Sequence, residues 1–339
     1  MKSDLFYFNV IVDANKMKYI SLVTLTVQNA ALGLSMRYAR TRPGNMFLSS
    51  TAVLMSEVVK LISCLGLVFH EEGSTFDRLK HALHTQIIQQ PLDTLKVCIP
   101  SMVYVVQNNL LYVAASHLDA ATYQVTYQLK ILTTALFTVI ILRRQLLITQ
   151  WIALVVLLLG VAMVQLAQTE PHTNSSNSST SDQNRWIGFG AALSACFLSG
   201  FAGIYFEKIL KGSSVSVWMR NIQLSVLSLP FGLGTCLIYD YSRINLHGFF
   251  FGYDAFIWYL IVLQATGGLL VAMVVKYADN ILKGFATSLA IIISCVFSIY
   301  FFDFNLTFQF SIGTLLVITA VFLYSHTPPK RSPHIATKI

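Results

Sequence analysis

The chain has 339 residues, of which 55% are hydrophobic and 11% carry a charge, and its formal net charge is +8. So few charges exclude an ordinary soluble domain, in which about a quarter of the residues are charged. The positive charge forms no basic stripe between exposed aromatic residues, so we expect no nucleic-acid partner. The composition therefore indicates a protein that crosses the lipid bilayer several times.

Apolar stretches long enough to cross about 30 Å of hydrocarbon follow one another along the chain. In the first half they cover residues 17–36, 47–69, 94–116, 119–142 and 147–167. In the second half they cover residues 186–207, 217–239, 255–275, 280–301 and 306–325. The sequence thus predicts an all-α integral membrane protein with ten transmembrane helices.

Basic residues indicate the orientation of these spans. Ten spans place both termini on one side of the membrane, and lysine and arginine accumulate in cytosolic loops. A cytosolic N-terminus leaves few basic residues on the opposite side, namely Arg37, Arg40, Arg42, Arg185 and Arg243. We therefore predict that both termini are cytosolic.

The connection 71–93 between the second and third spans contains a further helical pattern. Its apolar positions Phe76, Leu79, Leu83 and Ile87 have helical spacing within a charged segment. This pattern predicts an amphipathic helix that lies on the membrane surface.

The two halves of the chain repeat each other. A shift of 153 residues places Lys130 on Lys283, and the same shift pairs Gly160 with Gly313. Because an odd number of spans precedes the polar tract between the halves, the second half would insert upside down, as in many secondary transporters. We predict two inverted five-helix repeats, at 1–167 and 186–326, a lumenal linker at 168–185 and a cytosolic tail at 327–339.

Three sequons lie outside the predicted spans, at Asn174, Asn177 and Asn305. They fit the glycosylation pattern. All three are close to a predicted membrane edge, so we expect little or no modification there.

The two repeated lysines are the first candidate site. A lysine near the bilayer midplane costs roughly 2.5–3.5 kcal/mol, and its presence in both repeats is best explained by an anionic ligand. Tyr123, Tyr127 and Lys130 are spaced four and three residues apart and share one helix face. Such a face suits a base or ribose beside a phosphate. Alternatively, the tyrosines fill a helix contact and the lysine extends toward the membrane surface.

Other polar residues fall inside spans at helical spacing. Glu57 and Lys60 are close enough to pair, either as a structural ion pair or as a cavity pair that changes partners when an anion arrives. We expect Lys60 to contact the phosphate or sugar, with Glu57 orienting it. Tyr104 and Asn108 also share a face, and an amide matches the edge of a pyrimidine ring, although it also suits a bond between helices.

Charged residues at the ends of later spans point to gating or orienting roles. We assign such roles to Glu207 and Lys276, although Glu207 could equally anchor the topology or contact the ligand. No metal-like cysteine spacing, paired carboxylates or hydrolase motif occurs in the sequence. We therefore expect no catalytic residue, metal or cofactor, and favour transport over a membrane-embedded glycosyl- or phosphate-transfer enzyme.

Several strings resemble the pyrimidine nucleotide-sugar transporters of the Golgi, within the drug/metabolite transporter superfamily. They are residues 123–136, 199–208, 218–223 and 276–288, and the similarity covers nearly all of 17–326. The strings at 37–44, 211–218 and 248–253 look most like UDP-galactose transporters. Those at 110–113 and 118–123 are similar to the UDP-N-acetylglucosamine branch.

The resemblance implies a Golgi antiporter that exchanges a cytosolic nucleotide sugar for a lumenal nucleoside monophosphate. It implies a base pocket of Tyr104, Asn108 and Tyr123. It implies phosphate contacts from Lys130 and Lys283, and sugar or ribose contacts from Lys60, Tyr127 and Asn221. The expected substrates are UDP-galactose and UMP, with UDP-N-acetylglucosamine or UDP-N-acetylgalactosamine as alternatives. The expected surroundings are the lipid bilayer, and a homodimer or a complex with glycosyltransferases is left open.

Overall fold

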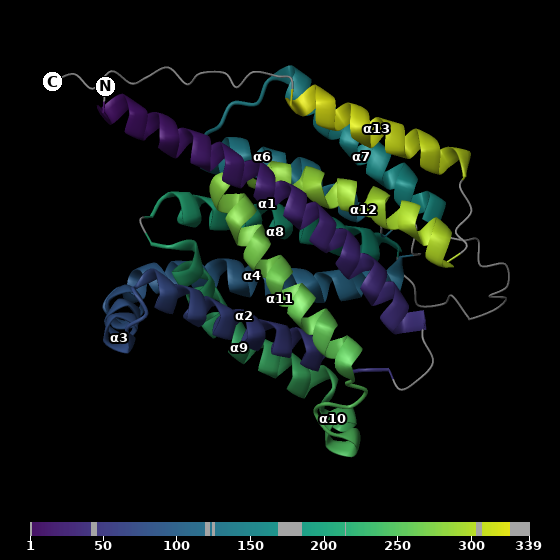
Figure 1. Cartoon of the computed structure of the whole chain (residues 1–339). Coiled ribbons are helices and arrows are strands. Elements are labelled where there is room, and N and C mark those ends of the chain that lie inside the picture. Colours follow the sequence, from purple (N-terminus) through teal and green to yellow (C-terminus); the bar gives the residue numbers. More distant parts are fainter. Residues whose placement is uncertain are drawn as a thin grey trace. The chain divides into compact units, whose positions relative to one another are not determined.

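The computed structural model of the protein describes residues 2–41, 46–118, 123, 126–168, 185–213, 215–302 and 307–325. Helices account for nearly all of these residues (Figure 1). From the first half come α1 (Lys2–Thr41), α2 (Ser49–Glu71), α3 (Phe76–Leu83), the π-helix η1 (His84–Ile88), α4 (Pro91–His117), α6 (Lys130–Leu142) and α7 (Ile148–Gln168). From the second half come α8 (Arg185–Lys211), α9 (Val217–Tyr239), α10 (Tyr241–His247), α11 (Ala255–Tyr277), α12 (Asn280–Phe302) and α13 (Phe308–Ser325).

Seven helices in the described residues are long and apolar enough to cross a membrane. They are Lys16–Met36, Ser49–Glu71, Ile148–Ala167, Arg185–Lys211, Val217–Tyr239, Ala255–Tyr277 and Phe308–Ser325. Two further apolar helices are shorter in their described parts, Thr126–Ile141 and Asn280–Ser294. All nine coincide with predicted spans, and α4 covers the remaining one at 94–116. The all-α membrane class is therefore confirmed, whereas ten crossings and the inversion of the second repeat stay predictions.

The chain divides into two compact units, and we describe each by itself. Unit 1 contains Met1–Asn108 and Tyr205–Asn305, and unit 2 contains Asn109–Ile204 and Leu306–Ile339. Each unit thus combines segments from both predicted repeats, and the repeat boundaries stay predictions.

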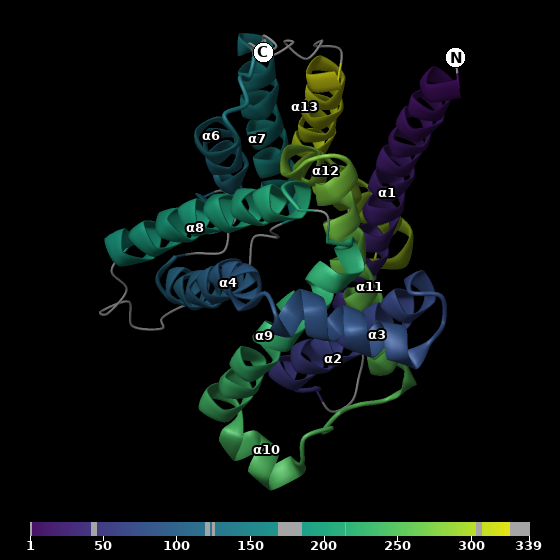
Figure 2. The same ribbon diagram turned by 90° about the vertical axis from the view of Figure 1, so that its left-hand side faces the viewer.

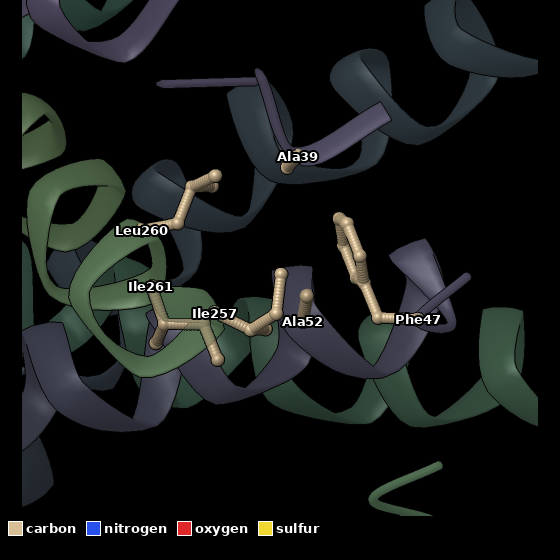
Figure 3. Close-up of a cluster of buried hydrophobic side chains, with 6 residues drawn as sticks. All are labelled: Ala39, Phe47, Ala52, Ile257, Leu260 and Ile261. Carbon is tan, nitrogen blue, oxygen red and sulfur yellow. The ribbon is translucent and has the colours of Figure 1, made fainter. Parts of the chain in front are cut away.

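In unit 1, α1 packs along α11 and α12, and α2 packs along α9 and α11 (Figure 2). One buried cluster joins three of these helices through Ala39, Ala52, Ile257, Leu260 and Ile261, with Phe47 ahead of α2 (Figure 3). Inside a bilayer, lipid is as apolar as these side chains, so close packing is what holds the helices together. The small alanines on α1 and α2 allow α11 to approach closely.

Polar groups fix the start of α2 within this unit. The Ser50 hydroxyl donates to Asp240 Oδ2 at 2.5 Å, and the Tyr253 hydroxyl donates to Thr51 Oγ1 at 3.1 Å. Partial burial raises the pKa of the Tyr253 phenol, so this group stays protonated and remains a donor near neutral pH. These bonds tie α2 to the end of α9 and to the segment that precedes α11.

The predicted amphipathic segment is helical over α3 and η1, a shorter stretch than 71–93. Leu79, Leu83 and Ile87 pack against a buried cluster that includes Val68 and Ile222. Phe76 begins α3 and is 77% exposed, and the centroid of its ring lies 4.9 Å from that of the Phe69 ring. The helix is therefore confirmed at all four apolar positions, whereas its placement on the membrane surface stays a prediction.

In unit 2, α7 and α13 run side by side (Figure 1 and Figure 2). A Cβ atom added to Gly160 would lie 2.9 Å from the Gly313 carbonyl oxygen and from Val317. A Cβ added to Gly313 would lie equally close to the Gly160 carbonyl and to Val164. This reciprocal contact joins residues that the 153-residue shift pairs, which supports the predicted duplication.

We expect Gly160→Ala to destabilise the protein by about 1–3 kcal/mol, the usual cost of overpacking against atoms that cannot move away. Gly190→Ala in α8 is the matched control, because a Cβ there meets nothing within 4 Å. The measurement is the midpoint of thermal unfolding in detergent. Equal midpoints for the two variants would show that the helices separate easily at this crossing.

Candidate functional site

Tyr123, Tyr127 and Lys130 lie together in unit 2, as their spacing predicts. The two tyrosine rings are stacked, with centroids 6.2 Å apart and an interplanar angle of 9°. The Lys130 ammonium lies 4.1 Å from the centroid of the Tyr127 ring. An ammonium over a ring face is attracted by the electrons of the ring, which offsets part of its desolvation. The predicted shared face is therefore confirmed, although its role in binding stays a prediction.

Tyr123 also supports the alternative interpretation of the tyrosines. Its side chain packs against a buried cluster that contains Ala114, Leu118 and Ala192. The ring thus fills a helix contact and stacks on Tyr127 at the same time. A packed ring is held in one orientation, which favours a defined surface for a planar ligand.

Each repeated lysine lies in the first turn of its helix. Lys130 is the first residue of α6, and Lys283 follows the start of α12 at Asn280 by three residues. In both helices a threonine one turn later donates to the lysine carbonyl, Thr134 at 2.7 Å and Thr287 at 2.9 Å. Because the start of a helix carries partial positive charge, an anion is favoured at the start of α12 in addition to the charge of Lys283. Lys130 follows helical residues that begin at Thr126, so this effect does not apply to it.

Glu57 and Lys60 form the predicted ion pair in unit 1. Lys60 Nζ lies 2.7 Å from both oxygens of the Glu57 carboxylate, and the Ser228 hydroxyl donates to Glu57 Oε2 at 2.9 Å. Lys60 is 7% exposed, and it passes close to Gly268, where a Cβ would lie 3.2 Å from Lys60 Cδ. The pairing is confirmed, and the contact of Lys60 with a sugar or phosphate stays a prediction.

Glu207 and Lys276 lie in a second polar cluster of unit 1. The Glu207 carboxylate accepts from Lys211 Nζ at 2.7 Å and from the backbone N–H of Asn280 at 2.9 Å. Lys276 Nζ donates to the Leu210 carbonyl at 2.5 Å. Both predicted orienting residues therefore contact neighbouring backbone or side chains within this unit.

Sequence reasoning missed a buried ion pair near the start of α9. Arg220 Nη1 lies 2.7 Å from Asp93 Oδ2, and the Arg220 side chain is 1% exposed. The same guanidinium donates to Gln223 Oε1 at 2.8 Å, and Gln223 Nε2 donates to the Gln86 carbonyl and to Thr94 Oγ1. Nothing in the sequence spacing of these two residues indicates that they pair.

The remaining predicted residues are Asn221, Tyr104, Asn108 and the three sequon asparagines. Asn221 is 1% exposed, and its amide nitrogen donates to the Val217 carbonyl at 2.9 Å. Tyr104 is partly buried on α4. The side chain of Asn108 and all of Asn174, Asn177 and Asn305 lie outside the described residues. A base pocket made by Tyr104, Asn108 and Tyr123 therefore stays a prediction.

The described helices and charges define an all-helical membrane protein that carries cations within its apolar segments. A family profile described as "Nucleotide-sugar transporter" matches residues 13–325. The chain belongs to this family. This membership confirms transport as the class of function and sets aside the transfer-enzyme alternative.

Similar proteins carry two kinds of substrate name. The UDP-N-acetylglucosamine transporter of Bos taurus is 51% identical over 315 residues, which cover 92% of this chain and 96% of the relative. The UDP-galactose/UDP-N-acetylglucosamine transporter of Caenorhabditis elegans is 53% identical over 311 residues, which cover 91% of this chain and 82% of the relative. The UDP-galactose translocator of Mus musculus is 53% identical over 310 residues, which cover 91% of this chain and 78% of the relative. A solved crystal structure, 10% identical, covers 92% of this chain and 98% of its own with a TM-score of 0.62, which shows a shared fold.

Proposed function

We propose that the protein is an antiporter of the Golgi membrane that imports cytosolic UDP-galactose in exchange for lumenal UMP. The observation that carries the proposal is the Tyr123, Tyr127 and Lys130 arrangement, in which stacked aromatic rings adjoin a cation. Aromatic faces suit a nucleotide base or ribose, and a compact ammonium suits a phosphate. In this proposal both termini face the cytosol.

The exchange follows from what the two substrates share. A UDP-sugar and UMP both contain uracil, ribose and a phosphate, so both can engage Lys130 and Lys283. Passage between the two open states is then favoured only when a phosphate is bound, because a ligand shifts a conformational equilibrium by its difference in affinity. The base would bind at Tyr104, Asn108 and Tyr123, and Lys60, Tyr127 and Asn221 would approach the ribose or sugar.

Galactose is proposed as the sugar because three separated strings, 37–44, 211–218 and 248–253, resemble UDP-galactose transporters. The mouse and nematode relatives with galactose in their names support this choice. UDP-N-acetylglucosamine is the second candidate, supported by the bovine relative and by the strings at 110–113 and 118–123.

We expect UDP-galactose to enter UMP-loaded proteoliposomes faster than other labelled nucleotide sugars. Related UDP-sugars should follow within about one to two orders of magnitude, because they differ by one or two hydrogen bonds of roughly 1 kcal/mol each. CMP-sialic acid should be a poor substrate, since its carboxylate requires a further cation.

A cellular test complements the transport measurement. In a cell line that lacks Golgi import of UDP-galactose, the chain should restore surface binding of a galactose-specific lectin. Failure there, together with restored N-acetylglucosamine capping in the corresponding mutant line, would move the assignment to UDP-N-acetylglucosamine. Proteoliposomes without internal UMP are the control for exchange, since a channel would not respond to UMP on the far side.

A further inference from the structure

The end of α8 holds the start of α12 through one carboxylate. Glu207 is 1% exposed, and its Oε2 accepts from the backbone N–H of Asn280, the first residue of α12, at 2.9 Å. Its Oε1 accepts from Lys211 Nζ at 2.7 Å. An acidic group at this position satisfies a backbone donor that has no partner within the helix, and it complements the helix dipole.

The connection between α11 and α12 is held from the same side. Lys211 Nζ also donates to the carbonyl of Ala278, which lies in this connection, at 2.5 Å. Lys276 Nζ donates to the carbonyls of Leu210 at 2.5 Å and Ser213 at 3.4 Å. Side chains at the end of α8 thus bind the backbone ahead of α12 and at its start, and Lys276 binds the backbone at the end of α8. A shift of the start of α12 relative to the end of α8 would therefore break several of these bonds.

Lys283 lies on the helix that these bonds fix. It follows Asn280 by three residues, so the two positions are neighbours on one face of α12. The direction in which Lys283 extends therefore depends on where the first turn of α12 begins. Glu207 has both oxygens engaged and is negatively charged, so it is unsuited to contact a phosphate itself.

We propose that Glu207 is a positioning residue, which sets the first turn of α12 and thereby places Lys283 against the substrate phosphate. This inference rests on the proposed function, because it assumes that Lys283 binds phosphate. A direct electrostatic role of Glu207 predicts the opposite change in phosphate affinity when its charge is removed. Removing a negative charge near a phosphate strengthens phosphate binding, whereas releasing the turn that carries Lys283 weakens it.

The test compares UMP with uridine, which lacks the phosphate, in binding to the purified full-length protein. Glu207→Gln should weaken UMP binding about threefold to tenfold, the factor expected for one carboxylate at a helix start. Uridine binding should stay within about twofold of wild type, because the base and ribose contacts do not involve α12 in this proposal. Glu207→Ala, where it folds, should show a larger loss for UMP alone.

Asp254→Asn is the matched control. Asp254 Oδ1 accepts from the backbone N–H of Ile257 at 2.9 Å and caps α11, which has no lysine in its first turn. This variant should change neither affinity. The inference is overturned if Glu207→Gln leaves UMP binding unchanged, tightens it, or weakens UMP and uridine equally.

One further variant separates this inference from the function on which it rests. Lys283→Ala should weaken UMP binding and spare uridine. If Lys283→Ala loses UMP binding while Glu207→Gln does not, the positioning role fails and the phosphate contact stands. If Lys283→Ala binds UMP as tightly as wild type, both the phosphate contact and the positioning role are overturned.

Discussion

Exchange of UDP-galactose for UMP should fall below detection when either Lys130 or Lys283 is replaced by alanine. A hydrogen bond to a charged group contributes about 1.5–3 kcal/mol, so losing one phosphate contact costs roughly tenfold to a hundredfold in binding. Because both substrates use the same phosphate contacts, the loss applies in each direction of transport. The measurement is initial uptake of labelled UDP-galactose into UMP-loaded proteoliposomes.

Loss of exchange in these variants can be separated from misfolding and from a general loss of positive charge. Lys130 and Lys283 are only partly buried, so removing either cation does not strain the fold, and both variants should insert and purify like wild type. Lys80→Ala provides the control, because Lys80 is an exposed cation on α3. Lys130→Arg and Lys283→Arg should be only partly tolerated, since a planar guanidinium does not replace a compact ammonium. More than half of the wild-type exchange rate in either well-folded alanine variant would falsify the phosphate role.

Residues that are close in the sequence were predictable in the structure. Tyr123, Tyr127 and Lys130 share a face because helical spacing brings positions three and four apart together. The same rule found the Glu57 and Lys60 pair. The positions of the apolar helices followed equally well from hydropathy, because a bilayer requires a stretch of roughly 20 apolar residues for each crossing.

Contacts between distant helices were not predictable from spacing. Glu207 was expected to orient or gate the site, and besides Lys211 one of its partners is a backbone N–H 73 residues away. Nearly every residue has a backbone N–H, so the sequence pattern could not indicate which of these groups Glu207 binds. Ser228 was missed as a partner of Glu57 for a related reason, since a serine in an apolar helix commonly bonds its own backbone.

The identity of the sugar is a different kind of problem. Discrimination between UDP-galactose and UDP-N-acetylglucosamine depends on a difference between two affinities, which one or two hydrogen bonds can set. Relatives with either substrate name are similar to this chain over almost the same length, at 51% and 53% identity. Overall similarity therefore does not carry this information, and transport measurements with matched substrates do.

The buried ion pair of Asp93 and Arg220 leads to the second large expected effect. Asp93→Ala should destabilise the protein by about 3–5 kcal/mol, because it leaves a buried guanidinium without its carboxylate. The geometry supports a cost at this scale, since the Arg220 side chain is 1% exposed and the Asp93 side chain is 26% exposed. Arg220→Met should cost less, because water can still reach the carboxylate that remains.

The two partners can be separated by combining the substitutions. In Asp93→Ala/Arg220→Met no buried charge remains, so the midpoint of thermal unfolding should recover at least half of what Asp93→Ala alone loses. Asp77→Ala, which removes an exposed carboxylate from α3, should leave the midpoint unchanged. If the double variant is as unstable as the sum of the two single variants, the residues act independently. The start of α4 is then held to α9 by the bonds of Gln223 to Thr94 and to the Gln86 carbonyl.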